Sequence, residues 1–283
     1  MSKHDEFFSA VTKGDPRFQP KFSWSPMIPV HASIIGMFSL FQGDFDRHIA
    51  TSIPLYRELQ LKQVEALIEL YVNKSPDTTH LLYDIAGSEG SWIKTLCEFG
   101  WNFAVNIDCN ADMKKLFNFR PSTRGVAVFA HNSFLADVGG VKAFVPPAKA
   151  DVVHAGMAFQ FMPYSIESCL KEVKDLYIKP RGLFLIEAKV KREDVAAWDA
   201  NERLKDLFKS RYYTEEQLSL KGDTVLKDMH NNLITRDHLE TALHEKFNYV
   251  KRYYQAGNFV GYACSDWSTA VSNFCYQIKP VKL

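Results

Sequence analysis

The chain has 283 residues, of which 46% are hydrophobic and 24% charged, and its formal net charge is +1. This length suits one large α/β domain or two small ones, and the near-neutral charge gives no global attraction to nucleic acid or anionic membranes. The five cysteines form no C-x-x-C pair, which is typical of reduced thiols in a cytoplasmic protein and argues against a zinc site. The polar start, MSKHDEFFSAVTKGDP, is unlike a signal peptide, and the apolar stretches are too short to cross a bilayer, so we expect no membrane partner.

Residues 1–75 are expected to form an N-terminal cap. Residues 1–50 are aromatic-rich, and prolines break any long helix there: Pro16, Pro20, Pro26 and Pro29. After Pro54, which suits the first turn of a helix, apolar residues recur at helical spacing until a turn at residues 74–77. The cap is therefore predicted to end in a helix.

From residue 76 onward, short apolar segments that are typical of strands alternate with helical patterns. A helix is expected over residues 92–99, ended by Gly100, and another over 166–177 with Ser165 as its N-cap. Residues 179–182 have the composition of a turn. The alternation predicts βαβ units and a parallel sheet, whose strands cover residues 81–85, 103–107, 126–129, 151–155 and 183–186.

The last third of the chain predicts an insertion followed by two late strands. Residues 190–245 are charged and helical in pattern, whereas residues 259–264 and 273–278 are spaced to pair as an antiparallel hairpin. A mostly parallel seven-stranded sheet closed by such a pair, with helices on both faces, is typical of the Rossmann-like class I methyltransferase fold. We therefore expect an α/β domain over residues 76–283, with a helical insertion and an N-terminal helical cap.

The sharpest local motif is the run Tyr83-Asp84-Ile85-Ala86-Gly87-Ser88-Glu89-Gly90-Ser91, which follows a predicted strand and opens a helix. Gly87 and Gly90 let the backbone approach a ligand, and a helix N-terminus supplies free N–H groups. A dinucleotide fold would have G-x-G-x-x-G here, whereas in this chain Asp84 comes first, placed to order the turn and accept from a ligand ammonium. The alternative is a tight turn without a ligand.

Polar residues also follow the second and third predicted strands. Asp108, with Cys109 beside it, ends the second strand about 20 residues past the turn, where nucleotide-binding folds hold ribose hydroxyls. Asn132, next to Ser133, has an amide that suits an adenine amino group, although a turn-forming asparagine is an equal alternative. Together with Asp84, Ala86 and the turn glycines, these residues predict S-adenosylmethionine (SAM) or S-adenosylhomocysteine (SAH) as the cofactor.

The end of the fourth predicted strand is expected to border the reacting centre. Gly156, after Ala155, leaves room for a substrate beside the sulfonium, and Phe159 and Phe161 are expected in the wall of the site. His154 is a candidate general base because an ordinary histidine titrates near neutral pH. The commoner alternative for a single histidine in a strand is a core residue.

Several segments resemble the carboxy-S-adenosylmethionine synthase family, a branch of the class I methyltransferases. Tyr83-Asp84 and Ser88-x-Gly90 are similar to its glycine turn, and residues 159–162 to the end of its fourth strand. Further similarity covers residues 5–10, 45–46, 52–56, 213–221 and 229.

The resemblance implies a homodimeric SAM-dependent enzyme in which Tyr56 reaches the cofactor from the cap and takes part in catalysis. The family transfers a carboxyl group from prephenate to the sulfonium methyl, through an ylide. This chain departs from the family at Ala86, where the family has glycine, at Gly156, where it has asparagine, and at Gly222, where it has the arginine that grips the carboxylate. Lys221 replaces such a bidentate arginine poorly, so the cofactor site carries over better than the carboxyl chemistry.

The sequence therefore predicts a cytoplasmic SAM-dependent methyltransferase acting on a small molecule or an unidentified acceptor. The alternative is a carboxy-SAM synthase. A nucleic-acid methyltransferase is a weaker alternative, because the run Phe161-Met162-Pro163-Tyr164 lacks the polar residue that would accept from a base amino group. A non-catalytic binding module with the SAM fold is the remaining one.

Overall fold

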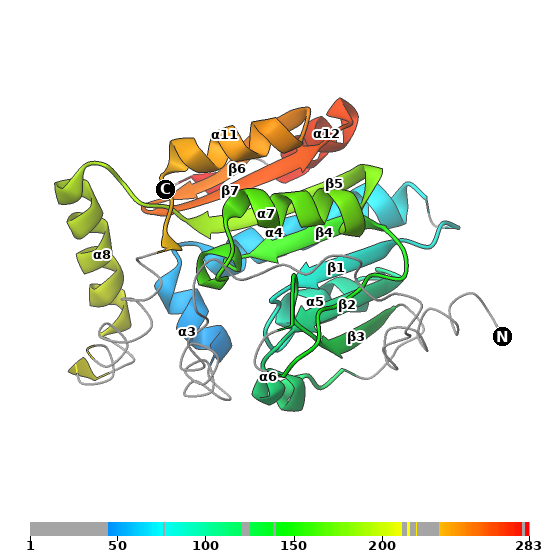
Figure 1. The fold of residues 1–283 in the computed structure, drawn as a ribbon, viewed down its shortest axis with the longest axis horizontal. Coiled ribbons are helices and arrows are strands. Elements are labelled where there is room, and N and C mark those ends of the chain that lie inside the picture. The colour runs from blue at the N-terminus through cyan, green and yellow to red at the C-terminus, as the bar shows by residue number, and fades with distance from the viewer. Residues whose placement is uncertain are drawn as a thin grey trace.

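A computed structural model describes residues 45–278 and 281–282, apart from 76, 120–124, 138–139, 211–213, 216–218 and 220–231. The expectations for residues 1–44, including the prolines between 16 and 29, and for Lys221 and Gly222 lie outside these described residues. The described chain forms one mixed sheet with a helical layer on each face (Figure 1). Within it, no helix has the length and apolar character needed to cross a membrane.

The sheet has eight strands in the order β3-β2-β1-β4-β5-β7-β6-β8. Neighbouring strands run parallel, except that β7 is antiparallel to both β5 and β6. Six of the expected strands are present, β6 takes the place of the seventh, and the two-residue β8 is added at the edge. In chain order the strands are β1 (Leu81–Ile85), β2 (Phe103–Asp108), β3 (Val126–His131), β4 (Ala150–Gly156), β5 (Ile178–Lys189), β6 (Tyr249–Ala256), β7 (Phe259–Ser265) and β8 (Val281–Lys282).

The strand order places a crevice at the carboxyl ends of β1 and β4. From β1 the chain proceeds outward through β2 to β3, then returns to the other side of β1 to form β4 and β5. Crossover connections leave in opposite directions from this point, so the strand ends there are open to a ligand. The central strands are nearly continuous apolar runs, because helices bury both of their faces. A polar residue at the tip of β1 or β4 therefore faces the crevice from a rigid support.

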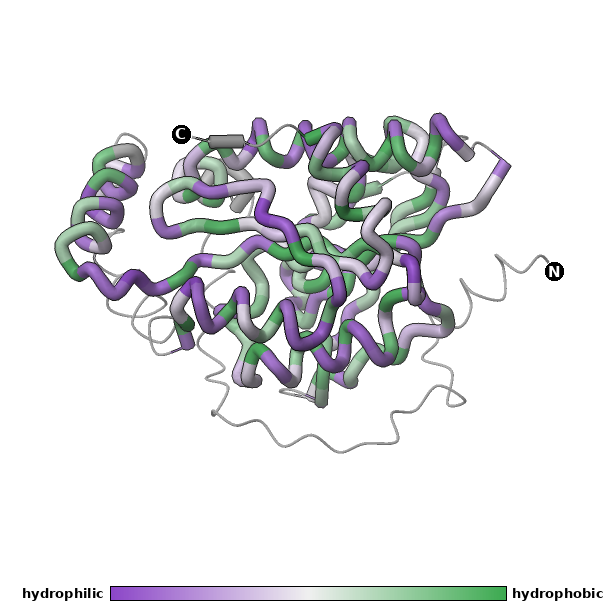
Figure 2. Tube along the Cα trace, turned by 90° about the horizontal axis from the view of Figure 1, so that it is seen from above, coloured by the Kyte–Doolittle hydropathy of each residue, from purple (hydrophilic) through white to green (hydrophobic). Residues whose placement is uncertain are grey.

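Each face of the sheet has its own apolar core. One core is covered by α7 (Ile166–Glu172) and α11 (Arg236–Lys246), and the other by α4 (Tyr56–Leu67), α5 (Ser91–Glu98) and α12 (Ser268–Ile278). Figure 2 shows the hydrophobic segments gathered in the middle of the molecule, between helices with hydrophilic turns. The other helices among the described residues are α3 (Phe45–Ser52), α6 (Ala111–Leu116) and α8 (Val195–Lys209), with π-helical turns after α4 (Ile68–Asn73) and α7 (Val173–Tyr177) and a 3-10 turn at Phe159–Phe161.

Residues 273–278 are not the second late strand that we expected. They belong to α12, in which Val271, Phe274, Cys275 and Ile278 are buried at helical spacing. A short apolar run can form either a strand or a helix. Here the buried residues recur every three to four positions, which is the spacing of a helix. The antiparallel partner of β7 is instead β6, which precedes it.

Two predicted boundaries also change. Residues 179–182 are not a turn but an irregular part of β5, where the ladder to β4 shifts register and Pro180 has no N–H to donate. Pro54 lies between α3 and α4 rather than in the first turn of a helix, because Leu55 adopts a left-handed φ of 57° before α4 begins. The N-cap predicted at Ser165 is confirmed, since its side chain accepts from the Ser168 N–H.

Candidate functional site

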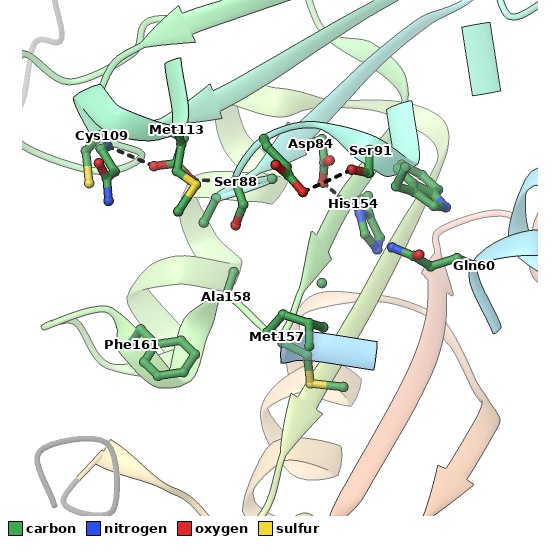
Figure 3. A pocket seen from close by; sticks show the side chains of 18 of the residues that line it. Gln60, Asp84, Ser88, Ser91, Cys109, Met113, His154, Met157, Ala158 and Phe161 are labelled. Atoms are coloured by element: carbon green, nitrogen blue, oxygen red, sulfur yellow. Dashed lines mark hydrogen bonds and ion pairs between the residues drawn. The ribbon is translucent and has the colours of Figure 1, made fainter. Parts of the chain in front are cut away.

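A cavity opens at the carboxyl ends of β1, β2 and β4, where the strand order predicts a crevice (Figure 3). Its lining comes from these strand tips, from the turns that follow them, and from α3 and α4 of the cap. The structure brings together in this lining eight of the residues singled out in the sequence: Tyr56, Asp84, Ala86, Gly87, Asp108, Cys109, His154 and Gly156.

Apart from Phe161, the other expected site residues do not line the cavity. Asn132 donates through Nδ2 to the Lys142 carbonyl at 3.1 Å, which fits the turn-forming alternative better than adenine binding. Phe159 stacks between core rings, with ring centroids 5.8 Å from Phe134 and 6.3 Å from Phe184. Gly90, Ser133 and Ala155 are buried in structural positions, at the start of α5, in a bridge to Ala143 and in the core.

Some lining residues were missed by the sequence analysis. Ile49 and Gln60 come from α3 and α4, and no local pattern shows which turn of a helix will face a distant strand tip. Others directly follow a strand tip already singled out, so their position in the chain was an available signal. These are Trp92 after β1, Asn110 and Met113 after β2, and Met157, Ala158 and Met162 after β4, whereas Ser88, Glu89 and Ser91 belong to the motif quoted after β1, and Phe161 was expected in the wall of the site.

The turn after β1 is tightly constrained. Ala86 and Ser88 both adopt left-handed backbone conformations, with φ of 54° and 52°. A side chain at Gly87 would place its Cβ 2.3 Å from Asp84 Oδ2, so only glycine fits between the turn and that carboxylate. The turn is also fixed to β2, because Asn106 Nδ2 donates to the Ser88 carbonyl at 2.7 Å. Such strain persists only where the surroundings enforce it, and it concentrates at functional sites.

Asp108 is held at the tip of β2 by two backbone donors. Its Oδ1 accepts from the Asn110 N–H at 2.8 Å, and its Oδ2 from the Ser88 N–H at 3.0 Å. A carboxylate has about four acceptor positions, so this fixed group can still accept from the two hydroxyls of a ribose. Burial raises the pKa of Asp108 to about 6, although the two N–H donors act in the opposite direction. The group is therefore charged at neutral pH and close to its titration range.

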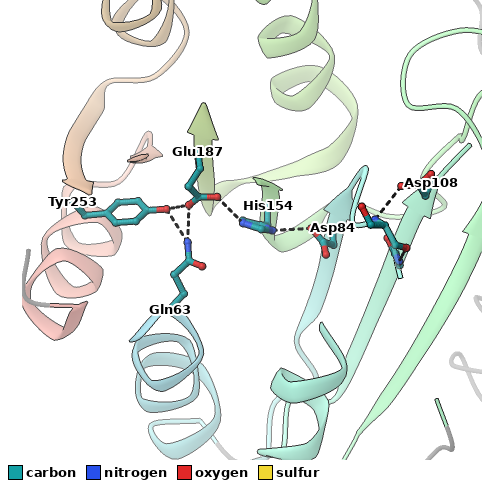
Figure 4. Close-up of polar contacts among 8 residues, drawn as sticks. Gln63, Asp84, Asp108, His154, Glu187 and Tyr253 are labelled. Atoms are coloured by element: carbon teal, nitrogen blue, oxygen red, sulfur yellow. Dashed lines mark hydrogen bonds and ion pairs between the residues drawn. The ribbon is translucent and has the colours of Figure 1, made fainter. Parts of the chain in front are cut away.

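His154 lies between two buried carboxylates, as Figure 4 shows. Its Nδ1 is 2.7 Å from Asp84 Oδ1, and its Nε2 is 2.8 Å from Glu187 Oε2. Burial by itself lowers the pKa of His154, but the charges of Glu187 and Asp84 and the hydrogen bonds to both raise it to about 10. The ring is an imidazolium at neutral pH and donates through both nitrogens. It has no lone pair with which to act as a general base, so that hypothesis does not fit this environment.

The polar network continues from Glu187 to α4 of the cap and to β6, the antiparallel partner of β7. Gln63 of α4 donates through Nε2 to Glu187 Oε1 at 2.6 Å and to the Tyr253 hydroxyl at 2.9 Å. The Tyr253 hydroxyl in turn donates to Glu187 Oε1. The Trp92 ring covers His154 with a centroid distance of 4.0 Å. The network thus ties α4, β5 and β6 to the strand tips that line the cavity.

The sequence matches no known protein family and no curated protein sequence. Among solved structures, the plantazolicin methyltransferase BpumL with SAH and a triazolic desmethylPZN analogue has a TM-score of 0.54 at 12% identity, covering 83% of this chain and 96% of that chain. BpumL with SAH alone has a TM-score of 0.53 at 10% identity, covering 93% and 99%. The N-methyltransferase NodS from Bradyrhizobium japonicum, also with SAH, has a TM-score of 0.51 at 9% identity, covering 82% and 97%.

These similarities confirm the class I methyltransferase fold that the sequence predicts, and at such low identity they show the fold alone. None of the three structures is a carboxy-SAM synthase, so the resemblance to that family gains no support from them.

Proposed function

We propose that this chain is a SAM-dependent methyltransferase acting on a small molecule or a peptide-like acceptor. The observation that carries the proposal is the pair of carboxylates, Asp84 and Asp108, which sit at neighbouring strand tips and line one cavity. Similarity in fold to proteins that were crystallised with SAH supports SAM as the cofactor. BpumL was solved with azole-containing analogues of its acceptor, which supports a peptide-like acceptor here by analogy alone.

The residues present fit a SAM molecule. Asp108 keeps acceptor positions for a ribose diol, and the backbone at Gly87 and Gly156 approaches the cavity without a side chain. When bound, SAM would supply an electrophilic methyl group on its sulfonium. The contribution of the chain is then alignment and exclusion of water, with the apolar side chains of Met113, Met157 and Phe161 in the lining.

The imidazolium at His154 has a consequence for the acceptor. Since both ring nitrogens are hydrogen-bonded to carboxylates, we propose that His154 does not remove a proton during transfer. We therefore propose that the acceptor attacks with a lone pair that is already free of a proton, as in a neutral amine. Such an acceptor does not need His154 as a base. Tyr56, which lines the cavity from α4, remains the proposed contact from the cap.

The test is to measure the ligand that copurifies, by mass spectrometry, and SAM binding by calorimetry. We expect SAM or SAH in the purified protein, and we expect Asp108→Ala to lose most of it, because the ribose loses its carboxylate acceptor. Asp112→Ala is the matched control, because Asp112 pairs with Lys115 on α6 outside the cavity and its loss should leave occupancy unchanged. Undiminished occupancy in Asp108→Ala would refute the ribose assignment.

The same mass measurement separates this proposal from the carboxy-SAM alternative. Carboxy-SAM carries the additional mass of a carboxyl group, whereas a methyltransferase retains SAM or SAH. Finding only carboxy-SAM in the wild-type protein would replace methyl transfer by carboxyl transfer as the proposed reaction.

A further inference from the structure

The cluster formed by Asp84, His154 and Glu187 carries an unbalanced charge. Two carboxyl groups flank one histidine at 2.7 and 2.8 Å, so with His154 protonated and both carboxyls ionised the cluster has one net negative charge. All three residues are buried. The other hydrogen-bond partners of Glu187, Gln63 and Tyr253, are neutral. In the part of the chain that the structure describes, no lysine or arginine pairs with either carboxylate.

Two glycines of the cavity lining lie directly against these carboxylates. The Cβ of a side chain at Gly87 would lie 2.3 Å from Asp84 Oδ2. At Gly156 it would lie 3.3 Å from Glu187 Oε2 and 2.7 Å from His154 Cε1. Both glycines line the cavity, so the backbone of the lining lies directly against the two carboxylates at these positions. The Trp92 ring covers His154 between them, so the negative field of the cluster reaches the cavity at the two glycines and at Asp84, which itself lines the cavity.

An uncompensated buried charge is costly, and a cation brought close to it recovers much of that cost. Within a low-dielectric site a single charge acts over several ångströms. SAM has two cationic groups, its ammonium and its sulfonium, whereas SAH keeps the ammonium and has a neutral sulfur. The cluster can therefore distinguish the two ligands at the sulfur position.

We propose that the Asp84–His154–Glu187 cluster makes the cavity selective for a cationic sulfonium, with Glu187 as the residue that determines this specificity. The inference rests on the proposed function and adds a preference for substrate cofactor over product. His154 acts as a positioning residue, because it holds both carboxylates under the glycines while leaving the cluster with a net negative charge. Loss of the methyl group removes the cation, which weakens the hold on the product and favours its release.

Glu187→Gln tests the proposal, because it is nearly isosteric and brings the cluster to zero net charge. Binding is measured by calorimetry with SAM, with SAH and with sinefungin, a SAM analogue whose amine provides a positive charge near the sulfonium position. We expect the affinity for SAM and sinefungin to fall about tenfold, the order of one partly screened charge, and that for SAH to change by less than about twofold. Equal losses for SAM and SAH would overturn the proposal, because they would indicate a structural role or an effect on the ammonium alone.

Glu172→Gln is the matched control, since Glu172 is a buried glutamate on α7 that does not line the cavity. Its affinities for the three ligands should equal those of the wild type. If circular dichroism shows that Glu187→Gln does not fold, the affinities of the wild-type protein test the proposal. SAM and sinefungin must then bind more tightly than SAH, and tighter binding of SAH overturns the proposal. A wild-type protein that binds none of the three refutes the proposed function itself, whereas one that binds all three without this preference refutes only the inference.

Discussion

At the scale of single residues, the protonation of Asp108 should control how cofactor affinity depends on pH. Burial raises the pKa of this carboxyl to about 6, with Asp84 nearby acting in the same direction and His131 against it. Above pH 6 the group is a carboxylate that accepts from the ribose, and below pH 6 it is protonated and loses acceptor capacity. We therefore expect the Kd for SAM to rise as pH falls from 7 to 5, by up to about tenfold per pH unit below 6, in calorimetric titrations.

Two variants decide whether Asp108 is responsible. Asp108→Asn cannot titrate, so it should bind weakly and without a break near pH 6. Glu172→Gln keeps the break, although burial raises the pKa of Glu172 to about 7, because that group lies outside the cavity. A wild-type Kd that is constant between pH 8 and 5 would contradict the prediction.

At the scale of secondary-structure elements, α8 is joined to β5 through a buried charged cluster. Glu202 of α8 contacts Lys189 of β5 at 2.8 Å and also pairs with Lys205. Burial alone raises the pKa of Glu202, but the two lysines lower it to about 2, whereas burial and Lys205 lower the pKa of Lys189 to about 8. The shift at Glu202 stabilises the folded protein and the shift at Lys189 opposes it. Removal of Glu202 would leave both lysines without their shared carboxylate. We therefore expect the stabilising effect at Glu202 to exceed the destabilising effect at Lys189.

Glu202→Gln should therefore lower the free energy of unfolding by about 3 kcal/mol at pH 7, measured by urea denaturation. The pKa of Glu202 is lower in the folded than in the unfolded chain, so its contribution is present above about pH 4.5 and is lost as pH falls toward 2. Asp206→Asn is the control on the same helix; its half-exposed side chain should contribute less than about 0.5 kcal/mol. A loss under about 1 kcal/mol in Glu202→Gln would show that the cluster does not stabilise the fold.

At the scale of the whole molecule, the sequence predicts the features that local patterns determine. Five parallel strands and the residues at their tips, such as Asp84 and Asp108, follow from apolar runs that end in polar residues. What it does not predict are pairings between distant segments. Glu187 meets His154 across neighbouring strands, and Gln60 reaches the cavity from the cap, because the sheet order and helix packing place them there. The environment of His154 depends on those long-range contacts, and so does our proposal that His154 is not the base.

The described part of the cap predicted for residues 1–75 contacts the domain that follows at several points. Gln63 of α4 bonds to Glu187 of β5, and the Tyr254 hydroxyl of β6 donates to the Pro54 carbonyl at 2.6 Å. Residues of α4 also belong to the same apolar core as α5 and α12. The homodimer implied by the family resemblance stays a prediction, which a rise of the unfolding midpoint with protein concentration would support.

These shared contacts predict that the cap and the sheet unfold together in one transition. Urea unfolding followed by circular dichroism and by tryptophan fluorescence should give the same midpoint, because Trp92 and Trp101 report on the core that α4 covers. SAM at about one hundred times its Kd should raise the free energy of unfolding by about 2.7 kcal/mol, since a ligand that binds only the folded state stabilises it by mass action. Asp108→Ala at the same SAM concentration should show almost no increase. Two separate midpoints, with SAM shifting only one of them, would instead mean that the cap is an independent unit and that the cavity it helps to line forms without it.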